Sequence, residues 1–349
     1  MRLDDREWKE FYLSGTSGIF ANHHGKRLTK EKRINGLIPL LTAGEQNNGV
    51  TEFISNNMDA HLNTITIDMF GNSFYHEYNC TGDDNIYFFS NDNLSKYSKI
   101  FIVELINKNK AKFSYGKQFR QKNADTLKII LPINQKQEPN YEFMEQYTKS
   151  IIDKKLNSYK KYAKSILHSL EYKEIKKLHD KEWGEFFIDE IAYIKPGKRL
   201  TKADMIKGNK PFIGSSDSNN GITEFTSNTN QSEDFNVLGV NYNGSVVENF
   251  YHPYKAIFSD DVKRLSLKDV EGNKYLYLFI KNLILKQKSK YQYAYKFNEK
   301  RLKRQKILLP VNKTNEPDYE YMEQYIKNLE HKKIKQYLDY LEAKNESKH

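Results

Sequence analysis

The sequence contains one cysteine, Cys80, among 349 residues and has no long apolar run. A single cysteine excludes an intrachain disulfide bond and a zinc site built from several cysteines, and such sparing use is typical of a reducing compartment. No segment approaches the ~20 apolar residues of a membrane span, and the opening segment MRLDDREWKEF lacks the apolar core of a secretory signal. We therefore expect a cytoplasmic protein that does not cross a membrane.

Signatures of common catalytic sites are missing as well. We find no glycine-rich cofactor loop after a strand, no Asn-Pro-Pro-Tyr segment of the amino-methyltransferase kind, no HExxH motif and no nucleophile elbow. The one Pro-Asp pair, at Pro317, stands at an expected helix start rather than in a nuclease motif. The sequence predicts a non-catalytic protein that needs neither a cofactor nor a metal ion.

The chain does carry an excess of positive charge. Its 56 Lys and Arg residues against 45 Asp and Glu residues give a formal net charge of +11 and a pI near 9.2. This charge favours a polyanionic partner such as nucleic acid. A lysine-rich surface that only serves solubility would have the same composition, so charge alone leaves both interpretations open.

The chain is an internal duplication with a period of about 175 residues. Five segments recur in the same order: EW at 7–8 and 182–183, GKRLTK at 25–30 and 197–202, NNGVTEF at 47–53 and NNGITEF at 219–225, FYH at 74–76 and 250–252, and LPINQKQEPNYEFMEQY at 131–147 and LPVNKTNEPDYEYMEQY at 309–325. Because this period is too long for a solenoid, it indicates two similar domains.

Each repeat mixes two kinds of pattern. Short β-rich runs separated by Gly and Asn indicate strands and turns, whereas 94–108 and 274–285 have apolar spacing closer to helical. Pro139 and Pro317 then each open a long stretch without further Gly or Pro, which predicts a long helix. We expect an α+β fold with globular domains at about 1–138 and 181–316, followed by long helices at 139–180 and 317–349.

The first long helix carries an apolar seam. Its residues follow a strict 4-3-4-3-4 spacing: Ile152, Leu156, Tyr159, Ala163, Ile166 and Leu170. Ile334, Tyr337 and Leu341 occupy the equivalent positions in the second helix. Because a heptad seam needs a partner helix, we expect the two helices to pack as an antiparallel coiled coil. The alternative is that each stripe covers only its own domain.

These segments together resemble a known family, the specificity (S) subunits of type I restriction-modification systems and their type IIB relatives. The resemblance rests on PLLTAGEQNNGVTEF and PFIGSSDSNNGITEF, the GKRLTK before each, the Leu-Pro strand ends and the long helices, and it covers essentially the whole chain twice. EPDYEYMEQYI looks more like the type IIB version. The resemblance implies two target recognition domains that read two half-sites of double-stranded DNA, joined by spacer helices that bind methyltransferase or fused restriction-methyltransferase subunits.

Candidate DNA contacts lie first in the repeated basic loop. Lys and Arg in a loop that begins with glycine suit contacts with phosphates. The residues are Lys26, Arg27 and Lys30, with Lys198, Arg199 and Lys202 in the second repeat. The alternative is a solvated turn kept for its glycine. We interpret the Asn-Asn-Gly and Phe-Tyr-His segments as mainly structural, since Cys80 near His76 has no counterpart in the second repeat.

A second set of candidates lies before the last strand of each repeat, where basic and aromatic residues alternate. These are Lys112, Phe113, Tyr115, Lys117, Gln118, Phe119 and Arg120, against Lys290, Tyr291, Tyr293, Tyr295, Lys296, Phe297 and Asn298 followed by Lys300, Arg301, Lys303 and Arg304. From these we predict DNA contacts at Lys117 and Arg120 and at Tyr295, Lys296 and Asn298. The alternative is that the aromatics belong to the core and the charges to the surface. The repeats differ most between 79–126 and 255–305, so we expect base specificity there.

The sequence therefore predicts a DNA-binding specificity subunit that directs a methyltransferase or restriction partner to a bipartite site. Two alternatives stay open at this point. One is a nucleic-acid-binding regulator that acts without an enzymatic partner, and the other is a nuclease or methyltransferase with an unrecognised site.

Overall fold

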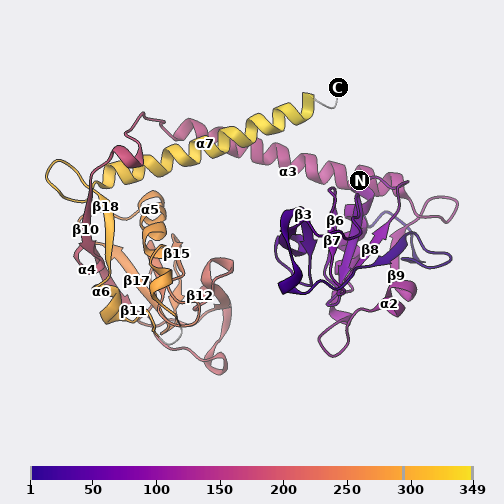
Figure 1. Cartoon of the computed structure of the whole chain (residues 1–349), viewed down its shortest axis with the longest axis horizontal. Coiled ribbons are helices and arrows are strands. Elements are labelled where there is room, and N and C mark those ends of the chain that lie inside the picture. The colour runs from indigo at the N-terminus through magenta and orange to yellow at the C-terminus, as the bar shows by residue number, and fades with distance from the viewer. Residues whose placement is uncertain (1, 293–294, 347–349) are drawn as a thin grey trace. The chain divides into compact units, whose positions relative to one another are not determined.

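The computed structural model describes residues 2–292 and 295–346. The chain divides into two units, Met1–Tyr159 and Lys160–His349. Each unit mixes strands and helices (Figure 1), which confirms the expected α+β class.

The first unit contains three small sheets. A two-stranded sheet pairs β1 (Trp8–Tyr12) with β9 (Lys128–Pro132). A four-stranded antiparallel sheet has the order β2 (Ala21–His24), β8 (Ile86–Ser90), β5 (Thr64–Asp68) and β6 (Ser73–His76). A three-stranded sheet has the order β4 (Val50–Ile54), β3 (Asn35–Leu41) and β7 (Thr81–Gly82). The helices are α1 (Lys96–Asn107), α2 (Gln121–Thr126) and the first part of α3 (Tyr141–Ser169).

The second unit repeats this arrangement. Its sheets are β10 (Trp183–Phe187) with β18 (Lys306–Pro310); β11 (Ala192–Pro196), β17 (Val262–Leu267), β14 (Val237–Asn241) and β15 (Asn249–His252); and β13 (Ile222–Thr226), β12 (Lys207–Ile213) and β16 (Ile257–Phe258). The helices are α5 (Lys274–Leu285), α6 (Glu299–Lys303) and α7 (Tyr319–Glu346), with an extra turn at α4 (Ile188–Ile191). The duplication seen in the sequence is therefore a duplication of the fold.

The core of each unit lies around one inner strand of its four-stranded sheet, β5 in the first unit and β14 in the second. All five residues of β5 and of β14 are buried, so these strands are covered on both faces. The apolar sides of α1 and α5 pack onto this layer, and each large side chain that leaves water there contributes roughly 1.5–3 kcal/mol. Both helices begin with a side-chain cap, Ser95 on α1 and Asn273 on α5.

Both long helices are capped by the residue that follows the repeated proline. Asn140 Oδ1 accepts a hydrogen bond from Phe143 N (3.0 Å), and Asp318 Oδ1 accepts one from Tyr321 N (3.0 Å). Such a cap stabilises a helix by typically ~1 kcal/mol. The helices therefore begin at Tyr141 and Tyr319, with the prolines just outside them.

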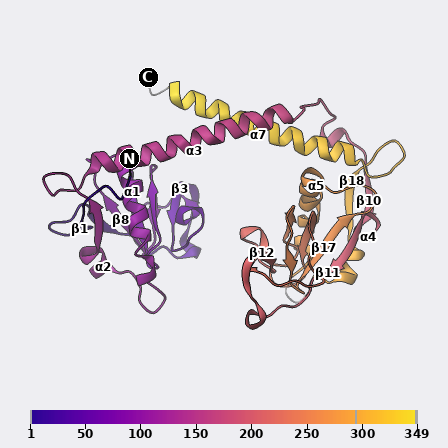
Figure 2. The same ribbon diagram turned by 180° about the vertical axis from the view of Figure 1, so that it is seen from behind.

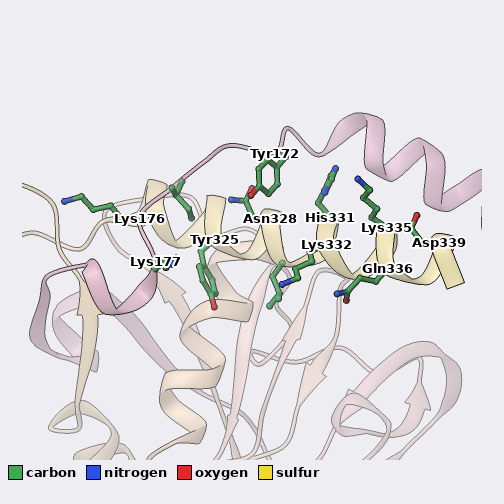
Figure 3. Close-up of a pocket in the computed structure, with 12 residues that line it drawn as sticks. Tyr172, Lys176, Lys177, Tyr325, Asn328, His331, Lys332, Lys335, Gln336 and Asp339 are labelled. Atoms are coloured by element: carbon green, nitrogen blue, oxygen red, sulfur yellow. The ribbon is translucent and has the colours of Figure 1, made fainter.

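The helix expected over 139–180 is shorter in the structure, because α3 ends at Ser169. Residues 170–177, which we call the strap, continue without regular structure along α7 (Figure 3). Side chains of α7 bind the strap backbone: Asn328 bonds both N–H and C=O of Lys173, and Tyr321 donates to the carbonyl of Lys176 (2.9 Å). These bonds replace the intrahelical bonds that a longer α3 would have made.

Part of the predicted seam is buried within the second unit. Ala163 and Leu170 are buried, and so are Leu338 and Leu341 of α7. Both views show the last turns of α3 beside α7, which runs in the opposite direction (Figures 1 and 2). Packing of the two helices as an antiparallel coiled coil stays a prediction. On α7, Leu338 is buried, whereas the predicted seam residue Tyr337 is 40% exposed.

The earlier seam residue Ile152 has a different environment. It lines an apolar groove of about 340 Å³ within the first unit, beside Trp8 and Phe101. At Ile152 the apolar side of α3 therefore packs on its own domain, which was the alternative to pairing with the second long helix. Pairing of Leu156 and Tyr159 with a second helix stays a prediction.

Candidate nucleic-acid interface

The glycine that opens each basic loop is required by the fold. A Cβ on Gly25 would lie 2.1 Å from the carbonyl oxygen of Asp83, and one on Gly197 would lie 1.9 Å from that of Ser259. Both distances are far below van der Waals contact, so any larger residue would displace the loop. The glycine is therefore kept for the close approach of the backbone. This requirement does not explain the basic side chains of the loop.

All six basic side chains of these loops are exposed: Lys26, Arg27, Lys30, Lys198, Arg199 and Lys202. Lys26 forms an ion pair with Asp59 (2.7 Å), and Arg199 lies 3.9 Å from Asp260. Exposed pairs of this kind are worth only about 0–1 kcal/mol. A phosphate could therefore replace these partners at little cost.

The Asn-Asn-Gly segments are left-handed turns in both units. Asn47, Asn48 and Gly49 have φ angles of 51°, 53° and 78°, and the second unit repeats this with 50°, 55° and 73°. Three successive residues with positive φ require Asn and Gly, which tolerate this backbone region. In the second turn the amide of Asn220 donates to the hydroxyl of Tyr254 (2.9 Å), so this side chain already has an internal role.

The histidines of the Phe-Tyr-His segments are buried structural residues. His76 Nε2 bonds Thr66 Oγ1 (2.8 Å), and burial lowers the His76 pKa to about 4. Burial, helped by nearby Lys281, lowers the pKa of His252 to about 4 as well. Cys80 is buried, and its pKa is raised to about 12, so it is a thiol. Residues 2–292 and 295–346 contain no group of three potential metal ligands.

The basic-aromatic stretch of the first unit is a small hairpin held by one buried ring. Ser114 and Lys117 bond each other through their backbones, and Phe119 is fully buried with its ring edge-on to Tyr87 and Phe113. Tyr115 is 83% exposed. The alternative that the aromatics form the core is thus right for Phe119 and wrong for Tyr115.

The two predicted contacts of this stretch, Lys117 and Arg120, are exposed on either side of the buried Phe119. Arg120 donates to the amide oxygen of Gln118, and its backbone N–H donates to Asn123 Oδ1 (2.9 Å). An arginine that is held beside a glutamine presents a fork of donors suited to a base edge or a phosphate.

The second unit repeats the buried ring and the flanking backbone bonds with different side chains. Phe297 is fully buried in place of Phe119, and Gln292 and Tyr295 bond as Ser114 and Lys117 do. Tyr293 lies outside the described residues.

The three predicted contacts here differ in availability. Tyr295 is 48% exposed, and its ring is covered by the Arg301 guanidinium, whose carbon lies 3.5 Å from the ring centroid. Asn298 Oδ1 caps α6 by accepting from Arg301 N (3.0 Å). Lys296 is half-buried.

Residues that the prediction did not select gather beside these three. Lys300, Arg301 and Arg304 join Tyr291, Tyr295 and Asn298 around a pocket of about 500 Å³, which we call the α6 pocket. The sequence does contain four basic residues between 300 and 304. Their spacing shows that charge is concentrated there but not which way the side chains point.

Similarity to known proteins identifies the family to which this chain belongs. The family model described as Type I restriction modification DNA specificity domain matches residues 5–161 and 180–339. The chain belongs to this family. It is 50% identical over 241 residues to the type II restriction enzyme specificity subunit S.BcgI from Heyndrickxia coagulans, with 69% of each chain covered. The crystal structure of the type I restriction-modification S subunit from M. genitalium shares the fold, at 16% identity and a TM-score of 0.51, over 98% of this chain and 94% of that one.

The chain is thus a restriction-modification specificity subunit, a DNA-recognition protein without a catalytic site of its own. Neither a regulator without an enzymatic partner nor an unrecognised nuclease or methyltransferase is favoured by these similarities. Among the described residues, no helix is both long and apolar enough to span a bilayer.

The buried histidines predict a pH-dependent stability. Their folded pKa of about 4 lies below the ordinary 6.5, so the unfolded chain binds protons that the folded chain does not. Stability should therefore be full above pH ~6.5 and should fall towards pH ~4, by up to about 3 kcal/mol per histidine. Thermal unfolding between pH 7.5 and 4.5 measures this, and His76→Gln and His252→Gln should flatten the profile. Exposed His179→Gln is the control, and an unchanged profile in both buried variants would contradict the assignment.

Proposed function

We propose that this subunit acts in the cytoplasm and directs a methyltransferase, or a fused restriction-methyltransferase, to a bipartite site on double-stranded DNA. Its target recognition domains, about 1–138 and 181–316, each bind one half-site. The segments 139–180 and 317–349 serve as spacers and docking surfaces. The observation that carries the proposal is that one fold and one basic loop occur in both units of a chain from a DNA specificity family.

The two kinds of basic segment have different tasks in this proposal. The loops with Lys26, Arg27, Lys30 and their counterparts Lys198, Arg199, Lys202 are identical in sequence, so they suit the DNA backbone, which is the same at every site. The stretches with Lys117 and Arg120, and with Tyr295, Lys296 and Asn298, differ between the units. Differences of this kind are what recognition of two unlike half-sites needs.

Within each unit, DNA and the partner have separate surfaces available. Helices α2 and α6 lie on the side of their own unit away from the long helix (Figure 1). This arrangement supports DNA contacts at the short helices and partner contacts near α3 and α7.

A repeated apolar groove supports docking of the same partner on both units. One groove is lined by Trp8, Leu105 and Lys108, and its equivalent is lined by Trp183, Leu283 and Lys286. On the adjoining helices, Ile151 and Leu329 occupy equivalent positions and are 43% and 42% exposed. Leu329 also lines a pocket of about 740 Å³ between α7 and the strap (Figure 3). Exposed apolar side chains beside a groove are typical of protein interfaces.

Base recognition can be tested with one variant in each unit. Arg120→Ala is expected to relax base preference in one half-site only, and Lys296→Ala in the other only, each at a cost of ~1–3 kcal/mol at one position. Competition binding against all single-base variants of the site measures this. Equal losses for every sequence would make these residues phosphate contacts, and no loss at all would remove them from the interface.

Partner docking can be tested by counting subunits. Ile151→Glu and Leu329→Glu each place a charge at one of two equivalent sites on a helix surface, so each should reduce the partner copies per chain from two to one. Native mass spectrometry of the assembled complex gives the count. Tyr162→Glu, at an exposed position of α3, serves as the control for Ile151→Glu. A full complement of partner subunits with both variants combined would contradict the proposal.

A further inference from the structure

We propose that the α6 pocket of the second unit binds one backbone phosphate of the DNA, and that the first unit has no such pocket. The inference rests on the proposed DNA-binding function and names one contact within it. It differs from the sequence prediction, which selected Lys296 and Asn298 and left the basic residues of α6 aside.

Arg301 is held in place before any ligand arrives. Its guanidinium carbon lies 3.5 Å from the centroid of the Tyr295 ring, and its Nη1 donates to the carbonyl of Lys296 (2.7 Å). Stacking and a hydrogen bond together fix the plane of the guanidinium. The remaining N–H donors of the fork then match the oxygens of a phosphate with little loss of side-chain entropy.

The tyrosine beneath Arg301 is itself supported from the core. Tyr295 stacks on Tyr291, with centroids 5.8 Å apart and the rings nearly parallel. Tyr291 packs on the fully buried Phe297 (4.4 Å), and its hydroxyl donates to Gln305 Oε1 (2.7 Å). The support for Arg301 therefore runs through two rings to a buried side chain.

The charges of the α6 pocket lack acidic partners. In the described part of the chain, no Asp or Glu forms an ion pair with Lys300, Arg301 or Arg304. The one acidic residue of α6, Glu299, is engaged by Lys303 (2.9 Å) and Lys263 (3.8 Å). Three cations around one pocket without a counterion favour an anion as ligand.

A phosphate fits this chemistry better than a base does. A base would need an open aromatic face on which to stack, and the Tyr295 ring already has Arg301 on one face and is stacked on Tyr291. The Asn298 oxygen, which could have read a base edge, caps α6 instead. What the pocket offers is donors and positive charge.

The equivalent positions of the first unit differ in charge. Asn123 stands in place of Arg301 and Thr126 in place of Arg304, and only Lys122 keeps the charge of Lys300. Asn123 Oδ1 is used by the backbone of Arg120 (2.9 Å). The position of Lys303 is occupied by Asp125, which accepts from Asn22 (2.9 Å). Helix α2 therefore lacks the two arginines of the α6 pocket, and the arginine of this stretch in the first unit, Arg120, lies before the helix.

The test uses the full complex of specificity subunit and partner, bound to DNA that contains the recognised site. Arg301→Asn combined with Arg304→Thr gives the second unit the residues of the first. The slope of log Kobs against log salt should become shallower by about 1, and affinity should fall by the same factor for every single-base variant of the site. Arg304→Thr alone leaves the Arg301 stack in place and should give a smaller change in the same direction. Lys303→Ala is the matched control, because this lysine of the same helix is paired with Glu299.

The outcomes separate the inference from the function on which it rests. An unchanged salt slope in both variants, while the wild-type complex still binds its site specifically, would overturn the phosphate pocket and leave the proposed function intact. A loss confined to one base position would overturn it too, because Arg301 would then read a base. A wild-type complex that shows no preference for any DNA sequence would instead refute the proposed function.

Discussion

One buried phenylalanine in each unit holds the basic-aromatic stretch against the core. Phe119 and Phe297 are fully buried, and each lies just before a short helix, α2 in the first unit and α6 in the second. Removing so much apolar surface from water stabilises the anchored conformation by roughly 1.5–3 kcal/mol. The residues on either side must then emerge at the surface at fixed places. Lys117 and Arg120 in one unit, and Arg301 beside Tyr295 in the other, owe their positions to this anchor.

Some parts of the two units are the same in both, and other parts differ between them. Gly25 and Gly197, the Asn-Asn-Gly turns and the buried histidines are required by close approach, positive φ or burial, and they recur in both units. The side chains around the hairpins have no such constraint, so they differ. In the first unit Lys117 and Arg120 precede α2, whereas in the second Lys300, Arg301 and Lys303 lie on α6 itself. A single scaffold thus presents two unlike surfaces.

Local pattern predicted much of the fold and only part of the site. The repeats, the α+β class, the left-handed turns and the two long helices follow from residues close in sequence. The end of α3 at Ser169 does not, because side chains about 155 positions away, such as Asn328, take the strap's backbone groups. Asn298 has the chemistry of a base reader, but the cap of α6 uses its oxygen. Arg301 gained its place through a stacking contact with Tyr295 that no spacing rule predicts.

We propose that each unit reads its own half-site through the segment in which the repeats differ most. A chain with residues 255–305 in place of 79–126 would carry the second unit's segment twice. Sequencing of methylated positions in DNA modified by this chimera and its partner tests the claim directly. We expect methylation at a new site made of two copies of the second half-site. Methylation that stays at the original bipartite site would contradict it.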